Sequence, residues 1–162
     1  MTTLSLTHHT LQTHEIGKAI LKQNFTYLQE VSNPNYDFVS LRTSAKLRFQ
    51  SENYSLSSFS DFKRKITNNL FVGTVHIDTV NKPGNIFSAY ENGVSYFVYL
   101  FILNKTIVVI KLNRSSVETI HRLMSVCREV EIINSGYKSI GRLLPIGLAC
   151  ECLKDHVIVD LL

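Results

Sequence analysis

Three residues in the last part of the chain are of the types that bind zinc in proteins. Cys150, Cys152 and His156 follow one another closely, and Cys127 or His121 would have to supply a fourth ligand. A closed zinc site needs four converging ligands, and this chain has no second pair at zinc-finger spacing. Cys150 and Cys152 are equally well explained as small apolar residues on one side of an extended segment. We therefore predict no bound metal or other cofactor, and Cys150, Cys152 and His156 remain the metal-site candidate.

Two further combinations could do acid–base or nucleophilic chemistry. His76 and Asp78 share one face of the strand expected in "FVGTVHIDTV", and a pair at this spacing could transfer protons. Polar residues on the wet side of a half-exposed strand explain the pair as well. Cys127 would need His76 or His121 as its base, but it lies on the apolar stripe of an expected helix. No glycine-rich phosphate loop or dinucleotide fingerprint is present, so we predict a protein that is not an enzyme.

Positive charge is concentrated in one part of the chain. The stretch "VSLRTSAKLRF", residues 39–49, alternates apolar and polar residues, which is typical of a strand with one wet face. Residues 38–72 contain six cations against two anions, and the rest of the chain sums to zero. The six cations are Arg42, Lys46, Arg48, Lys63, Arg64 and Lys65. Such a local field attracts phosphate, whether on RNA or on anionic lipid, although a solvated face is the plainer interpretation.

Composition favours a folded chain in a reducing compartment. The protein has 162 residues, 44% of them hydrophobic and 19% charged, which suits one domain with a substantial core. Three cysteines without a secretory signal predict no disulfide framework. The longest apolar run, residues 96–103, is too short to span a bilayer as a helix.

The first half of the chain is expected to alternate helix and strand. We expect a flexible N-terminus over residues 1–12 and then a helix from Thr13 to Glu30, capped by Thr13. Its buried stripe would contain Ile16, Ala19, Ile20, Gln23 and Tyr27. After a turn at Pro34 come a strand over residues 38–49, a loop over 50–57 and a short helix over 59–69. Tyr36 and Tyr54 flank the basic strand and could stack on bases.

The second half is expected to consist of hairpins around one helix. Strands are predicted over residues 70–80, 86–90, 94–103, 106–112, 129–133 and 156–162. Turns are predicted at residues 81–85, at Asn92-Gly93, which is a two-residue hairpin signal, and at residues 134–136. A capping box at Ser115 and Glu118 predicts a helix to about Cys127. Pro145 and Gly147 indicate that no regular element forms between them and the last strand.

These elements together predict the fold class. Hairpins imply antiparallel pairing, so the expected fold is α+β, a mainly antiparallel sheet packed against two or three helices. Residues 13–162 are expected to form this single domain.

The stretch Leu47–Gly73, "LRFQSENYSLSSFSDFKRKITNNLFVG", resembles the opening of the folded core of rhabdovirus matrix proteins. The shared pattern is a basic alternating strand, a polar loop with serine, a helix that opens at Ser60-Asp61, and the aromatic-x-Gly exit Phe71-Val72-Gly73. The chain departs from the pattern by lacking a long lysine-rich N-terminal arm, a proline-rich late-budding motif and a tryptophan at the helix exit.

The resemblance implies a non-enzymatic viral structural protein of matrix type. Such a protein self-associates, as a homo-oligomer, and contacts the nucleocapsid and an anionic membrane surface. In this chain the six cations would make those contacts. It would reside in the host-cell cytoplasm, at the inner periphery of the membrane and in the virion. The same charges would also suit an RNA-binding viral accessory protein that antagonises host defence or silencing.

Overall fold

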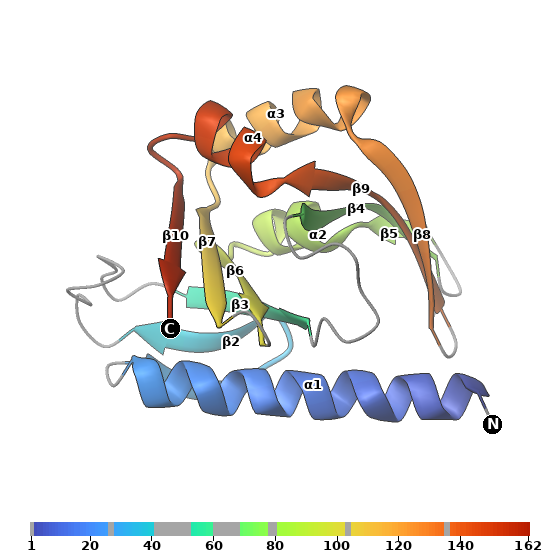
Figure 1. Cartoon of the computed structure of the whole chain (residues 1–162), viewed down its shortest axis with the longest axis vertical. Helices are drawn as coiled ribbons and strands as arrows, with labels where there is room; N and C mark the ends of the chain where they lie inside the picture. The colour runs from blue at the N-terminus through green and yellow to red at the C-terminus, as the bar shows by residue number, and fades with distance from the viewer. Residues whose placement is uncertain are drawn as a thin grey trace.

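The computed structural model of the protein combines helices and strands in an α+β arrangement (Figure 1). The structure describes residues 2–25, 28–40, 53–59, 69–77, 81–102, 105–134 and 137–162. The helices are α1 (Thr2–Asn24), α2 (Asn85–Glu91), α3 (Arg114–Leu123), the 3-10 turn η1 (Met124–Val126) and α4 (Ile146–Cys152). The strands are β1 (Leu28–Asn33), β2 (Tyr36–Ser40), β3 (Asn53–Phe59), β4 (Asn69–Ile77), β5 (Asn81–Pro83), β6 (Tyr96–Phe101), β7 (Thr106–Lys111), β8 (Arg128–Asn134), β9 (Tyr137–Pro145) and β10 (Val157–Leu161).

The described strands form two sheets. The larger has the order β1-β2-β3-β6-β7-β10, and the smaller has the order β5-β4-β9-β8. All neighbouring pairs are antiparallel except β3 and β6, which run parallel over six residue pairs. The predicted α+β class with a mainly antiparallel sheet is therefore confirmed.

The central strands of the larger sheet are buried on both faces. On one face Val98, Leu100 and Val109 pack with Leu21 of α1 and with Phe25, which directly follows this helix. On the other face the smaller sheet, α2, α3 and α4 complete a second cluster, to which β6 contributes Phe97, Tyr99 and Phe101. Figure 1 shows α1 at one side of the molecule and α3 and α4 at the opposite side. Burial on both faces explains why β6 and β7 read as continuous apolar runs rather than alternating ones.

α1 differs from its predicted extent and orientation. It begins at Thr2 rather than Thr13, because adding a residue to an existing helix is easier than starting one and no proline or glycine interrupts residues 2–12. It ends at Asn24, and residues 28–30 belong to β1 instead. No described helix combines the length and apolar composition that crossing a membrane requires.

The predicted apolar stripe of α1 is confirmed at Ile20, which packs against the core, but it is wrong at Ile16, which is 51% exposed, and at the exposed Ala19 and Gln23; Tyr27 lies outside the described residues. Over residues 12–25 the buried positions are Thr13, Gly17, Leu21 and Phe25. These residues are spaced by four, so they lie on one helix face. A face that carries threonine and glycine lets the helix approach β3 closely, and the count of apolar residues alone did not reveal this.

Residues 85–94 form a helix where a strand and hairpin were predicted. Gly93 adopts a φ of 77°, which suits the Asn92-Gly93 pair, but here it ends α2. The Val94 and Gly93 amides donate to the Ala89 and Tyr90 carbonyls, at 3.0 and 3.1 Å. This bonding closes a helix C-terminus with glycine as its left-handed residue. Asn-Gly supplies the same conformation to a hairpin turn, so the dipeptide alone does not distinguish the two.

Several other elements differ from the predicted ones in type or in extent. Residues 53–59 form β3 rather than a loop and the start of a helix, and residues 81–83 form β5 instead of a turn. α4 covers residues 146–152 because Pro145 precedes its first turn, where proline is tolerated. The strands at β4, β6, β7, β8 and β10 are confirmed, whereas β9 was not predicted. The predicted basic strand is described only up to Ser40, and the helix predicted over 59–69 lies outside the described residues apart from its two ends, Phe59 in β3 and Asn69 in β4.

The helix after β7 is confirmed, but its cap is not the predicted one. Asn113 is the N-cap, and its side chain accepts from the Ser116 amide at 2.9 Å while Ser116 Oγ accepts from the Asn113 amide at 3.1 Å. Asparagine caps as well as serine does, so the helix starts as soon as β7 ends. Glu118 pairs instead with Arg114 Nε at 3.0 Å.

Asn85 connects the two sheets. Its Oδ1 accepts from the Gly73 and Ile86 amides, both at 2.8 Å, and its Nδ2 donates to the Phe71 carbonyl at 2.9 Å. The fully buried Tyr99 of β6 donates to the same carbonyl at 2.5 Å. Burial raises the pKa of Tyr99, against a smaller lowering by Asn85, so its hydroxyl stays protonated as a donor. One amide thus satisfies groups from β4, α2 and β6.

Glycines make this junction possible. A Cβ on Gly84 would lie 1.9 Å from the Gly73 carbonyl oxygen, and one on Gly141 would lie 2.3 Å from the Val72 carbonyl oxygen. Contacts this short cannot occur, so the backbones approach closely only because these side chains are absent.

Asn85→Ala is expected to lower the free energy of unfolding by about 3 kcal/mol, because two backbone amides lose their acceptor away from water. Tyr99→Phe is expected to cost about 1 kcal/mol, since Asn85 still satisfies the Phe71 carbonyl. Urea denaturation followed by circular dichroism measures both. Asn92→Ala, which removes an exposed side chain whose Nδ2 donates to the Ser88 carbonyl at 2.9 Å, is the control and should change stability by less than about 0.5 kcal/mol. Equal losses for Asn85→Ala and Asn92→Ala would contradict the role of Asn85.

Candidate anion-binding interface

The six predicted anion-binding residues belong to two segments that border β3. Arg42, Lys46 and Arg48 lie between β2 and β3, and the run Lys63–Lys65 lies between β3 and β4. Both segments, residues 41–52 and 60–68, lie outside the described residues. For these two segments the structure therefore describes only the ends of the strands that flank them.

The described body of the protein is close to neutral. Of the 17 basic and 13 acidic residues in the chain, six basic and three acidic ones lie outside the described residues. That leaves eleven basic against ten acidic residues in the described part. Almost all of the excess positive charge therefore belongs to the segments around β3, which suits an attraction that is local rather than spread over the molecule.

β3 is held firmly on both sides. It pairs with β6 from Tyr54 to Phe59 and with β2 at Phe38–Tyr54 and Val39–Asn53. Tyr54 is 1% exposed and stacks on Tyr96 with 5.5 Å between ring centroids. A strand of seven residues is about 23 Å long, so the two basic segments leave the sheet from points about that far apart.

The burial of Tyr54 corrects one expectation. Tyr54 cannot stack on a base, because it lies in the core beneath α1. Tyr36 is half-buried and packs against the other cluster. Phe71, Phe97 and Phe101 are buried in the core.

Asp37 joins β2 to β3 and α1. Beyond the two residue pairs of the β2–β3 ladder, its Oδ2 accepts from the Leu56 amide at 2.7 Å in place of a backbone carbonyl. Its Oδ1 lies 3.4 Å from Nε2 of His14. Burial alone would raise the pKa of Asp37, but hydrogen bonds from His14 and the Leu56 amide hold it below its ordinary value. The ionised carboxylate is therefore the form that this junction favours.

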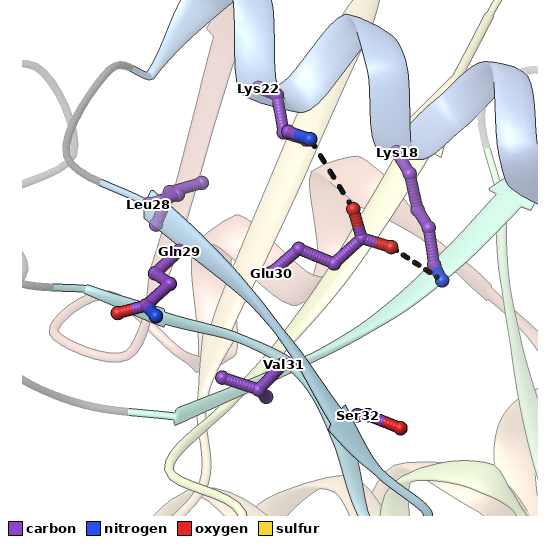
Figure 2. Close-up of a pocket in the computed structure, with 7 residues that line it drawn as sticks. All are labelled: Lys18, Lys22, Leu28, Gln29, Glu30, Val31 and Ser32. Carbon is purple, nitrogen blue, oxygen red and sulfur yellow. Dashed lines mark hydrogen bonds and ion pairs between the residues drawn. The ribbon is translucent and has the colours of Figure 1, made fainter.

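A second contact ties α1 to β1. Lys18 and Lys22 donate to the two oxygens of Glu30, at 3.0 and 3.4 Å, across an open groove that Leu28, Gln29, Val31 and Ser32 also line (Figure 2). The hydrogen bond from Lys18 lowers the pKa of Glu30, and the same bond raises the pKa of Lys18. The charges in this groove are already paired, so the groove is not an extension of the basic segments. Sequence reasoning missed Asp37 and Glu30 because nothing local marks their long-range partners.

The metal-site candidate is not brought together. Cys150 and Cys152 lie on helix α4, where a spacing of two places side chains on nearly opposite sides, and not on an extended segment. Both are exposed, and Nδ1 of His156 lies 3.5 Å from Nδ2 of Asn113. No group of three or more potential ligands gathers anywhere in the part of the chain that the structure describes.

Neither of the two predicted catalytic combinations gains support from the described residues. Cys127 is buried as expected, and this burial raises the pKa of its thiol, partly offset by Arg142, which makes it a poor nucleophile. His121 is exposed on α3 and contacts the ring edge of Phe87. His76 lies in β4 at the register position of Ser139, and Asp78 lies outside the described residues, so their pairing stays a prediction.

Asp37→Ala is expected to reduce the free energy of unfolding by about 2 kcal/mol at pH 7, because the Leu56 amide and His14 lose their acceptor. Asp37→Asn, which keeps an acceptor without charge, should cost about half as much. Because the folded pKa is the lower one, the charge contributes fully above the ordinary value of 3.8, and its contribution is lost as pH falls through the folded value. The stability gap between wild type and Asp37→Asn should therefore shrink between pH 7 and pH 3, measured by urea denaturation. The exposed Asp155→Asn is the control, and a gap of the same size at pH 3 would contradict this account.

Comparison of the chain with family models, with curated proteins and with solved structures gives no match.

Proposed function

We propose that the protein is a non-enzymatic viral structural protein of matrix type, which self-associates and binds the nucleocapsid, an anionic membrane surface, or both. The residues that bind are Arg42, Lys46, Arg48, Lys63, Arg64 and Lys65. The observation that carries this proposal is the separation of charge: a nearly neutral body bears two short segments with almost all of the excess positive charge. Its work would take place in the host-cell cytoplasm, at the inner membrane periphery and in the virion.

Five of the eleven cations among the described residues are already paired with an anion. Lys18, Lys22, Arg114, Lys138 and Arg142 each have a carboxylate within 4 Å. Cations that are already paired attract a further anion weakly, because the pair has little net field. The basic segments have few acidic residues of their own, namely Glu52 and Asp61.

The alternative is an RNA-binding accessory protein that antagonises host defence or silencing. Proteins that grip single-stranded RNA usually combine cations with aromatic rings on which bases stack. Tyr54 is buried and Tyr36 is half-buried against the core, so the two tyrosines that flank the first basic segment do not favour base stacking. Binding through point charges toward phosphates, on lipid head groups or on a nucleocapsid, suits the surface better.

Flotation of the protein with liposomes tests the membrane branch. Wild type should float with vesicles that contain phosphatidylserine and not with neutral ones, and flotation should fall as salt is raised. A variant with all six proposed residues changed to glutamine should lose this binding. A matched control changes six exposed cations of the described body to glutamine, namely Lys105, Lys111, Arg114, Arg122, Arg128 and Lys154, and it should keep most of the binding.

Equal recovery of both sixfold variants would show that net charge, not the position of the segments, determines binding, and it would sink the proposal. A gel-shift series with single- and double-stranded RNA separates the alternative. If the six cations contact single-stranded phosphates, log K should fall against log salt with a slope of about −4. Tight RNA binding without any preference for anionic vesicles would favour the accessory protein.

A further inference from the structure

Lys18 and Lys22 reach one carboxylate from the same face of α1. The two lysines are four residues apart, which places their side chains on one side of the helix. Lys18 Nζ lies 3.0 Å from Oε1 of Glu30, and Lys22 Nζ lies 3.4 Å from Oε2. Figure 2 shows the Glu30 side chain extending from β1 to the space between the two ammonium groups. Two cations therefore converge on the two oxygens of a single anionic group.

The groove around this contact offers room and access for a ligand. Its volume is about 740 Å³, within the range of ~300–1,000 Å³ that small-ligand sites occupy. The side chains of Glu30 and Lys22 are 37% and 52% exposed, so an anion from solution can reach them. Leu28 and Val31, which also line the groove, are half-buried. Apolar walls with a few converging polar groups are typical of ligand sites.

Glu30 is the anion that occupies the position between the two lysines. It is the one acidic residue among those that line the groove, against two basic ones. The hydrogen bond from Lys18 lowers the pKa of Glu30, so its carboxyl is ionised at pH 7. Glu15 lies 3.8 Å from Lys18, with its side chain 73% exposed, and Asp37 attracts Lys18 more weakly, but neither lines the groove. The pair of ammonium groups is therefore neutralised mainly from one side, by a carboxylate of the protein itself.

We propose that Lys18 and Lys22 form a second anion-binding site, which takes a phosphate monoester and which Glu30 occupies in the absence of that ligand. This inference deepens the proposed function and rests on it for the membrane as the source of the phosphate. Only β2 separates β1 from β3, the strand that the basic segments border. Two spacings between neighbouring strands amount to about 10 Å, so the groove lies near that strand.

A phosphate monoester fits the position that Glu30 now fills. It carries about −1.5 to −2 charges at pH 7 and three acceptor oxygens, against one charge and two oxygens for a carboxylate. Two of its oxygens can accept from Lys18 and Lys22 as the Glu30 oxygens do, and the third remains on the open side of the groove. The ion pairs that the ligand replaces are partly exposed, and water and salt weaken such pairs. Binding is an exchange of partners in which no covalent bond forms or breaks.

Titration of the full chain with inorganic phosphate tests the inference, followed by the backbone amide NMR signals of Lys18 and Lys22. Sodium chloride at equal ionic strength is the blank. Wild type should bind phosphate weakly, because Glu30 competes with it. Glu30→Gln keeps the size of the side chain without its charge, and it should bind phosphate about fivefold more tightly, the scale set by exposed ion pairs. Wild-type signals that do not move, or a folded Glu30→Gln that binds no more tightly than wild type, would overturn the inference.

Glu131→Gln is the matched control. It changes the net charge by the same amount and removes the carboxylate that lies 3.4 Å from Lys138 Nζ, but it leaves no converging pair of lysines. This variant should bind phosphate as wild type does, and a gain equal to that of Glu30→Gln would show that net charge alone explains the effect. Adding Lys18→Gln and Lys22→Gln to Glu30→Gln should abolish the gain, and a gain that survives would overturn the site.

Flotation with vesicles identifies the source of the phosphate. The variant in which the six cations of the basic segments are changed to glutamine should not float with anionic vesicles. Adding Glu30→Gln to it should restore flotation with vesicles that contain phosphatidic acid, which carries a phosphate monoester. Flotation with phosphatidylserine, whose phosphate is a diester, should recover less. Phosphate binding by Glu30→Gln without any such flotation would support the site and assign it to free phosphate.

The same measurements separate this inference from the proposed function. If wild type binds anionic vesicles but Glu30→Gln binds phosphate no more tightly than Glu131→Gln does, the second site is overturned and the proposed function stands. If Glu30→Gln gains phosphate binding while wild type binds neither vesicles nor RNA, the second site is supported and the proposed function fails.

Discussion

The constraint on which the rest of the structure depends is that β6 and β7 are buried on both faces. Residues 97–101 and 107–110 all lie in the interior, so a single covering layer would not be enough. α1 covers one face, and the smaller sheet with three short helices covers the other. Each fully buried aliphatic or aromatic side chain of this hairpin contributes about 1.5–3 kcal/mol. The junction at Asn85 then fixes how the second layer sits on the first, because one amide bonds to β4, to α2 and, through Tyr99, to β6.

Strong local sequence patterns correctly predicted several strands and one helix, whereas weak patterns led to wrong predictions of secondary structure. The apolar runs of β6 and β7, the alternation of β8 and the final strand were predictable, because their residues report burial directly. Residues 53–59 were not, since "NYSLSSF" is rich in serine and becomes a strand only by lying between β2 and β6. Asn92-Gly93 signalled a left-handed residue correctly but could not say which element it follows. α1 illustrates a third limit of prediction from the sequence. The side of this helix that is buried depends on its close approach to β3 and not on where the apolar residues are most numerous.

The candidate interface was predictable as a charge imbalance and no further. A count along the chain locates the six cations around residues 41–65, and the near-neutral body sharpens that contrast. The contacts that anchor β3 could not be predicted from the sequence, since Asp37, His14 and Leu56 are brought together only by the tertiary fold. The burial of Tyr54 was equally unpredictable, although it removes one of the two tyrosines that were expected to stack on bases.

The parallel pairing of β3 with β6 has a consequence for how the chain folds. β6 and β7 are adjacent in sequence and joined by a short connection, so they can meet early. β4, β5 and α2 separate β3 from β6 in the sequence, so pairing these two strands closes a much longer loop, and only then is the sheet face on which α1 packs complete. Closing such long loops is entropically slow, so the central hairpin is the natural nucleus and β3 is a late arrival. The two basic segments, which border β3 on either side, would then come to their final neighbourhood in the last stage of folding.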